Sequence, residues 1–322
     1  MTPTDSRRLV DPELLTLLDT MPTVALSADN LSEIRATSRL PIPAAGPEGD
    51  TVEVSHLIVP GPPDAPHVDV IVYRPKEATG ALPCILHVHG GGYVLGSAAA
   101  QDSPHRTLAA RLNCIIATVE YRLAPETVFP GAVEDCYSTL SWIFDNAANM
   151  DVDPLRIGVS GESAGGGLAA GLALLTRDRA KYRLAFQHLI YPMLDDRTCA
   201  HADPHPHTGE FIWTPHNNRF GWAALLGRTP GSEGISPYAA AARAEDLSNL
   251  PPTFISTGAL DLFVEEDLEY ARRLMRAGVA TELHVYPGGF HGFDFHPDAA
   301  VSRQARRDSF AALARFVAHS PI

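Results

Sequence analysis

The chain has 322 residues, of which 45% are hydrophobic and 20% are charged, a composition typical of folded globular proteins. Its 25 Lys and Arg residues against 38 Asp and Glu residues leave a formal net charge of −13, and no basic stripe occurs along it. Nucleic acid and anionic membrane surfaces are therefore excluded as expected partners. The length fits either two domains or one large α/β domain with an insertion.

Gly, Pro or a charged residue interrupts every apolar stretch well before the roughly 18 residues that a membrane span requires. The N-terminus mixes Asp and Glu with its leucines and has no uninterrupted apolar region of the kind that marks a secretory signal. We therefore expect a cytoplasmic protein. Widely separated cysteines without a C-x-x-C pair predict buried free thiols: Cys84, Cys114, Cys136 and Cys199.

Residues 1–45 predict one or two amphipathic helices, followed by a link rich in Pro and Gly at 41–49. Two β-patterned runs come next, at 51–59 and 68–73. Strands and helices then alternate, as is typical of a parallel sheet. The expected strands are 84–88, 114–120, 156–160 and 186–191, and the expected helices are 101–112, 132–148 and 164–177.

The alternation lapses over residues 195–250, a stretch too long for an ordinary loop, which includes a helix-like run at 218–226. We interpret it as a lid-type insertion. The pattern then resumes with strands at 253–257 and 281–286 and helices at 265–277 and 299–319. The sequence thus predicts an α/β domain with a core of residues 46–194 and 251–322, and a helical cap of residues 1–45 and 195–250.

One motif, Gly161-Glu162-Ser163-Ala164-Gly165, fits G-x-S-x-G between a predicted strand and a predicted helix. Small residues on both sides permit a strained turn that lifts the serine hydroxyl above the sheet edge. The alternative is a glycine-rich turn in which Ser163 only caps the helix. The context favours Ser163 as a nucleophile.

A second motif, His89-Gly90-Gly91-Gly92, follows another predicted strand. Consecutive glycines leave backbone N–H groups unobstructed, so the amides of Gly91, Gly92 and Ala164 are candidates for an oxyanion hole. A phosphate-binding loop is disfavoured because the run lacks the lysine of G-x-x-x-x-G-K-[ST].

A nucleophilic serine needs a neutral imidazole as its base and a carboxylate that orients the base. In the chain order that G-x-S-x-G predicts, both partners follow the serine, on loops after later strands. Asp261 and His291 occupy such positions, although Asp261 alternatively suits a helix N-cap. Rival acids and bases beyond Ser163 are Glu265, Asp267, His284 and His296.

These motifs, with Tyr121-Arg122-Leu123-Ala124-Pro125-Glu126 and the Phe129-Pro130 pair that follows, resemble the hormone-sensitive lipase branch of the α/β-hydrolases, the bacterial type IV carboxylesterases. The resemblance covers about residues 80–295. Runs 119–126 and 250–253 are most similar to the actinobacterial heroin-esterase-like members.

The resemblance implies an α/β-hydrolase fold, a mostly parallel sheet flanked by helices, and a hydrolase of small-molecule carboxylic esters that uses no cofactor and no metal. It also implies that the N-terminal helices and the central insertion cover the acyl and alcohol pockets. Two residues depart from the family pattern. Glu162 stands where Asp is more usual, and Leu262 replaces the proline that usually follows the acid.

Two further sets of residues lie in the insertion. Phe211, Trp213 and Trp222 suit either the core of the cap or the lining of a substrate pocket. The histidines of 201–207 have the side-chain type of a zinc site, but two prolines keep this run extended, which favours a solvated loop.

The sequence therefore predicts a serine carboxylesterase for short-chain acyl esters, with Ser163 as nucleophile, His291 as base and Asp261 as the orienting acid. An amidase or arylacetamide deacetylase remains an alternative, because the same machinery cleaves amides. A non-catalytic receptor on this fold, as in the gibberellin receptors, is disfavoured by the complete triad. The natural substrate, its stereochemistry and a homodimeric state stay open.

Overall fold

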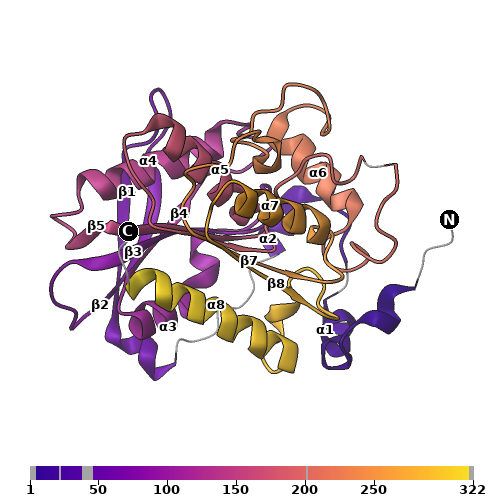
Figure 1. Ribbon diagram of the computed structural model, residues 1–322, viewed down its shortest axis with the longest axis horizontal. Coiled ribbons are helices and arrows are strands. Elements are labelled where there is room, and N and C mark those ends of the chain that lie inside the picture. The colour runs from indigo at the N-terminus through magenta and orange to yellow at the C-terminus, as the bar shows by residue number, and fades with distance from the viewer. Residues whose placement is uncertain (1–4, 22, 38–45, 201, 319–322) are drawn as a thin grey trace.

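The computed structural model describes residues 5–21, 23–37, 46–200 and 202–318. In these ranges eight strands form one sheet in the order β1-β2-β4-β3-β5-β6-β7-β8 (Figure 1). The strands are β1 (Val52–Val59), β2 (Val68–Pro75), β3 (Leu82–Val88), β4 (Ile115–Glu120), β5 (Val152–Glu162), β6 (Gln187–Ile190), β7 (Thr253–Gly258) and β8 (Thr281–Tyr286).

The sheet begins with an antiparallel pair and continues in parallel. β1 pairs with β2 and β2 with β4 in antiparallel register, whereas every pair from β4 to β8 is parallel. Each residue of β3 is buried, as expected for a parallel strand covered by helices on both faces. The prediction of a mostly parallel α/β sheet is confirmed.

Helices cover both faces of the sheet (Figure 1). On one face lie α4 (Gly131–Asp145), α5 (Ala164–Arg179) and α7 (Val264–Arg276), and on the other lie α3 (Asp102–Leu112) and α8 (Ala300–Ala318). The remaining helices are α1 (Leu15–Thr20), α2 (Leu31–Thr37) and α6 (Pro215–Leu226), outside the sheet layers. The predicted alternation is thus confirmed element by element.

Some element boundaries differ from the expected ones. β5 begins at Val152, four residues before the predicted strand, because Val152 pairs with Leu82 across a local irregularity in register. α6 begins three residues before the predicted run, at Pro215, because the Thr214 hydroxyl caps it by accepting the Asn217 N–H. In the N-terminal segment the helices are short, and residues 41–45 of the predicted link lie outside the described residues.

The N-terminal segment packs on the loop that follows β8 and on the insertion. Its Leu14 and Leu17 are buried in one cluster with Phe290 and Phe293, against which Phe211 and Ile212 of the insertion also pack. Leu9 of the same segment lies outside this cluster and is 38% exposed. Asn217 of α6 accepts the Leu26 N–H and donates to the Val24 carbonyl.

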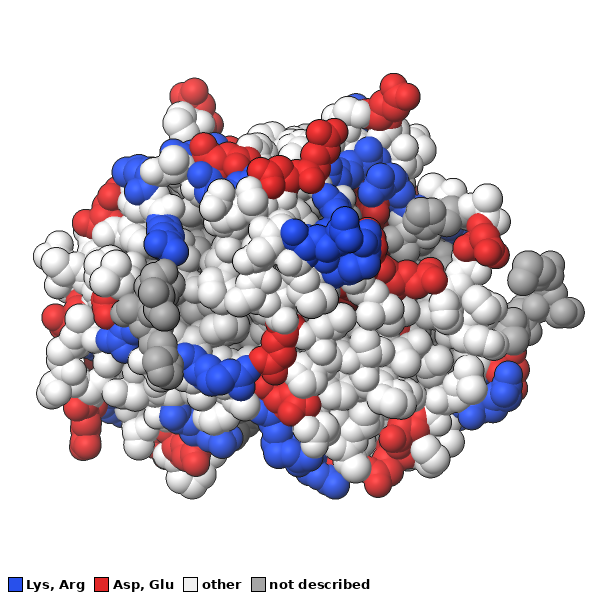
Figure 2. All heavy atoms as spheres, viewed as in Figure 1, with Lys and Arg blue, Asp and Glu red and all other residues white. Residues whose placement is uncertain are grey.

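The distribution of charge on the surface and the state of the cysteines can be compared with what the sequence predicts. On the face drawn in Figure 2, groups of Lys and Arg side chains lie beside Asp and Glu side chains. Across the part of the chain that is described, no helix combines the length and hydrophobicity of a membrane span. All four cysteines are free; Cys84, Cys114 and Cys136 are buried as predicted, whereas Cys199 is half-buried and accepts a hydrogen bond from Asn218.

Candidate active site

Ser163 lies in the tight turn between β5 and α5, at the carboxyl edge of the sheet. Its φ of +56° is rare for a residue with a side chain, and such strain is typical of functional turns. The turn needs small neighbours: a Cβ on Gly161 would lie 2.4 Å from the Gly165 carbonyl oxygen, and one on Gly165 would lie 2.1 Å from that of Val88. The Ser163 side chain makes no capping bond to α5, so it is free for another role.

The hydroxyl of Ser163 instead points to a histidine. Its Oγ lies 2.9 Å from Nε2 of His291, and Nδ1 of the same ring lies 2.8 Å from Oδ2 of Asp261. The other carboxylate oxygen of Asp261 accepts the Phe263 N–H at 3.0 Å. The structure thus brings together three residues that are separated by up to 128 positions in sequence.

Burial and aromatic rings restrict the histidine. Ser163 and His291 are 6% and 7% exposed, and Asp261 is fully buried. Tyr191 and Phe263 meet the imidazole edge-on, with ring centroids 4.8 and 5.2 Å away. These contacts hold the ring between the serine and the carboxylate.

The rival acids and bases lie elsewhere. Glu265 is exposed on α7, and His284 pairs with Glu282. Asp267 is buried, and burial raises the pKa of its carboxyl well above the ordinary value, with the charges of Glu266 and Asp261 adding to the effect. The carboxylate that meets His291 is that of Asp261, and the imidazole that meets Ser163 is that of His291.

The glycine motif after β3 faces the serine turn. Gly91 and Gly92 have φ values of +123° and +61°, which favour glycine. A Cβ on Gly91 would lie 2.1 Å from the Leu95 carbonyl oxygen, and one on Gly92 would lie 2.0 Å from the Trp213 ring. Ala164, the third predicted donor, is the first residue of α5, where backbone N–H groups have no partner within the helix.

Glu162, next to the serine, carries a contact set that the sequence did not reveal. Its Oε1 accepts the Gly90 N–H and a Gln101 N–H, both at 3.0 Å, and its Oε2 lies 2.8 Å from Nε2 of His87. Burial would raise the pKa of Glu162, but His87 and the Gly90 N–H together lower it to about 2. Nothing in the spacing of these residues signals that they meet.

Behind the histidine, Tyr191 donates a hydrogen bond of 2.9 Å to Asp294, a second contact that the sequence did not reveal. Burial raises the pKa of Asp294 above its ordinary value. Tyr191 follows β6 and itself has a positive φ of 34°. Tyr191 is the last residue of the predicted strand 186–191, and Asp294 lies between the predicted strand 281–286 and helix 299–319, so no pattern in the sequence pairs them.

The three predicted pocket residues occupy different environments. Trp213 packs on Gly92, with its ring centroid 6.3 Å from that of His291, and its Nε1 donates to Asn218. Phe211 packs edge-on against Phe290, next to His291. Trp222 is fully buried against Tyr93, with ring centroids 5.1 Å apart. Trp213 thus lies near the histidine, Phe211 packs on the residue before it, and Trp222 belongs to the buried core.

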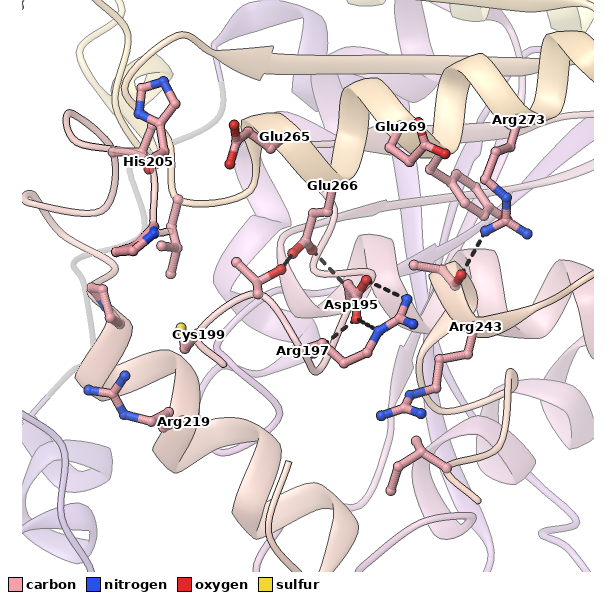
Figure 3. A pocket seen from close by; sticks show the side chains of 18 of the residues that line it. Asp195, Arg197, Cys199, His205, Arg219, Arg243, Glu265, Glu266, Glu269 and Arg273 are labelled. Carbon is pink, nitrogen blue, oxygen red and sulfur yellow. Dashed lines mark hydrogen bonds and ion pairs between the residues drawn. The ribbon is translucent and has the colours of Figure 1, made fainter. Parts of the chain in front are cut away.

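A separate cavity of about 890 Å³ lies between α6, α7 and residues 195–199 and 203–208 (Figure 3). Its lining is rich in charge and excludes Ser163 and His291. Asp195 and Arg197 form an ion pair in it, and the buried Glu266 accepts the Leu194 and Asp195 N–H groups. These contacts connect α7 to the start of the insertion.

The histidine-rich run gives no metal centre in the residues that the structure describes. Within those ranges no three His, Cys, Asp or Glu residues are grouped as metal ligands. The rings of His205 and His207 lie 6.2 Å apart, and His201 lies outside the described residues.

Comparison with known proteins places this chain in a family. A model of the α/β-hydrolase fold matches residues 85–295, and the chain belongs to this family. The chain is 35% identical over 320 residues to carboxylesterase NlhH of Mycobacterium tuberculosis, covering 97% of this chain and 98% of the relative. It is 31% identical over 300 residues to arylacetamide deacetylase of Mus musculus, covering 74% and 75% of the two chains.

Solved structures agree with this assignment. The structure matches a bacterial heroin esterase with a TM-score of 0.90 and 39% identity, covering 97% of this chain and 99% of that one. The similarity to the hormone-sensitive lipase branch that the motifs predicted is therefore confirmed.

Proposed function

We propose that this carboxylic ester hydrolase cleaves short-chain acyl esters, with Ser163, His291 and Asp261 as its catalytic triad. The class of hydrolase rests on relatives that match nearly the whole chain. The observation that carries the residue assignment is the continuous path from Ser163 Oγ to His291 Nε2 (2.9 Å) and from His291 Nδ1 to Asp261 (2.8 Å).

The geometry supports the following sequence of steps. Ser163 Oγ attacks the ester carbonyl carbon while His291 Nε2 takes its proton, and the buried Asp261 carboxylate stabilises the imidazolium. Collapse of the tetrahedral intermediate breaks the bond to the alcohol, which leaves with the proton from Nε2. Water then attacks the acyl carbon while His291 takes its proton, and collapse of the second tetrahedral intermediate breaks the bond to Ser163 Oγ, which regains the proton as the carboxylic acid leaves.

The oxyanion of both intermediates needs donors that are fixed before the reaction. We assign this role to the amides of Gly91, Gly92 and Ala164. Three observations support the assignment: the glycine motif packs against the serine turn, its two glycines have positive φ values, and Ala164 is the first residue of α5, where N–H groups have no partner within the helix.

A cap formed by residues 1–45 and 195–250 would limit the acyl group. Support comes from Leu14 and Leu17, which pack beside Phe290 and Phe293 on either side of His291, and from Asn217, which bonds the N-terminal segment to α6. The Trp213 ring against Gly92 narrows the space next to the oxyanion donors. This crowding favours short acyl chains.

A panel of p-nitrophenyl acetate, butyrate and octanoate, with the matching anilides, tests the proposal. Ser163→Ala is the control, and its kcat should fall on the order of 10⁶-fold. The proposal expects ester turnover that declines from butyrate to octanoate. Turnover retained by Ser163→Ala, or octanoate as the best ester, would contradict it.

Amide hydrolysis is the second candidate, favoured by the similarity to arylacetamide deacetylase. The same panel separates the two activities, because an amidase releases the amine from the anilides at a rate that depends on Ser163, although activated esters are intrinsically more reactive. Anilides that stay uncleaved while the matched esters turn over would leave ester hydrolysis as the function.

A further inference from the structure

Glu162 joins the nucleophile turn to the glycine motif. It is the last residue of β5, directly before Ser163, and its Oε1 accepts the Gly90 N–H at 3.0 Å across 72 residues of sequence. Gly90 also packs against it: a Cβ at this position would lie 2.9 Å from the Glu162 carbonyl oxygen. The start of the glycine loop is therefore held directly against the serine turn.

The two carboxylate oxygens of Glu162 bind three donors. Oε1 takes Gly90 and Gln101, and Oε2 takes His87. An ionised carboxylate only accepts hydrogen bonds, so Nε2 of His87 carries the hydrogen of this contact. On the far side of the ring, Nδ1 of His87 lies 3.2 Å from the Thr118 hydroxyl, which fixes the orientation of the imidazole.

Because the Gly90 N–H already donates to Glu162, it cannot donate to the substrate. The same bond fixes the orientation of the two peptide groups that follow. Gly91 and Gly92 come directly after Gly90, and their N–H groups are the proposed oxyanion donors. A donor displaced by about 1 Å loses much of its effect on the rate, on the order of 100-fold. The position of Gly90 thus sets the strength of the oxyanion hole.

We propose that Glu162 is a positioning residue. Through its bond to Gly90 it holds the oxyanion loop, His89–Gly92, which carries two of the three proposed oxyanion donors, at a fixed position relative to Ser163. The inference rests on the proposed function, and it assigns Glu162 no contact with substrate. Glu162 therefore stabilises the tetrahedral intermediates, which carry the oxyanion, and does not change the affinity for the bound ester.

Substitutions of Glu162 separate this role from simple stabilisation. Glu162→Ala leaves Gly90 without its acceptor, and we expect kcat for p-nitrophenyl butyrate to fall about 100-fold while KM changes less than about 3-fold. The Ki of an aryl trifluoromethyl ketone, which forms an oxyanion with the serine, should rise by the same factor. In the pH profile of kcat/KM, the acid limb, where activity falls as pH is lowered, should stay at the same pH, because the substitution leaves the contacts of His291 with Ser163 and Asp261 unchanged.

Glu162→Gln is the conservative rescue. Its carbonyl oxygen can keep Gly90 and Gln101, and its NH₂ can donate to Nε2 of His87 if the ring hydrogen moves to Nδ1 and bonds Thr118. Most of the rate that Glu162→Ala loses should therefore return. If Glu162→Ala does not fold, Glu162→Asp tests the same point, since a carboxylate shorter by one methylene cannot span Gly90 and His87; its kcat should fall about 10-fold with a matching rise in the ketone Ki.

The outcomes distinguish this inference from the proposed function. An inactive wild type, or an active Ser163→Ala, would refute the proposed function itself. An active wild type with a folded Glu162→Ala, or failing that Glu162→Asp, that keeps kcat and the ketone Ki within about 2-fold would overturn the role of Glu162. A shifted acid limb in either variant would also overturn it, because the residue would then act through His291.

Discussion

Replacing Asp261 by Asn tests how the histidine is held. Asp261 is fully buried, and its oxygens have two different partners: Oδ1 accepts the Phe263 N–H at 3.0 Å and Oδ2 faces Nδ1 of His291 at 2.8 Å. The Phe263 N–H can only donate, so the carbonyl oxygen of the introduced side-chain amide has to face it. The NH₂ group of that amide then faces His291.

This orientation forces the wrong tautomer. An NH₂ group beside Nδ1 requires Nδ1 to accept a hydrogen bond, which places the ring hydrogen on Nε2. A protonated Nε2 can no longer take the proton of Ser163. The same change in a serine protease triad lowers kcat by about 10⁴, and we expect a loss of that order here. Packing is unchanged, so the variant should fold.

The assay is kcat for p-nitrophenyl butyrate at pH 7, with thermal unfolding as the measure of folding. Two matched controls change carboxyl groups of α7. Asp267→Asn changes a buried carboxyl, and Glu265→Gln changes an exposed one. Both controls should keep kcat within about 5-fold of the wild type. If either control loses more activity than Asp261→Asn, the assignment of the acid is wrong.

Further predictions concern the oxyanion loop, the cap and the buried histidines. Gly92→Ala should lower kcat on the order of 100-fold, because its Cβ would meet the Trp213 ring; the double variant with Trp213→Ala should recover part of that loss, and an additive loss would contradict the steric explanation. Asn217→Leu removes both bonds to the N-terminal segment and should raise kcat/KM for octanoate relative to acetate; an unchanged ratio would separate this segment from the cap. Burial, and to a smaller extent the charge of His87, lowers the pKa of His188 from 6.5 to about 3. Below pH 6.5 the unfolded chain therefore binds a proton at this residue that the folded protein does not bind. Stability should fall by up to about 1.4 kcal/mol per pH unit from this residue as pH drops below 6.5, and His188→Gln should flatten the slope of urea unfolding between pH 6.5 and 5; an identical slope would contradict the linkage. EDTA should leave ester turnover unchanged, and loss of activity that zinc restores would refute a metal-independent mechanism.

The sheet was predictable because its signals are local. Buried runs such as 84–88 alternate with helical periods, and this alternation is sufficient for a parallel sheet. Boundaries were less predictable. β5 begins at Val152 because of pairing with Leu82, a contact between strands that no single window of sequence contains.

The site was predictable where one motif carries its own geometry. The flanking glycines define the turn of Ser163, and the chain order restricted the search for Asp261 and His291. The contacts of Glu162 were not predictable, because Gly90, Gln101 and His87 come from separate elements and meet only in the folded sheet. The same holds for Trp213, whose approach to Gly92 depends on how the insertion folds back.

The most direct test of the central claim is covalent labelling of the nucleophile. Purified protein is treated with paraoxon, and the modified peptide is identified by mass spectrometry, alongside Ser163→Ala. The account predicts one diethyl phosphoryl group per chain, located on Ser163, with ester turnover lost in proportion to labelling and no label on the variant. Full labelling at another residue, or complete modification of Ser163 with turnover intact, would contradict it.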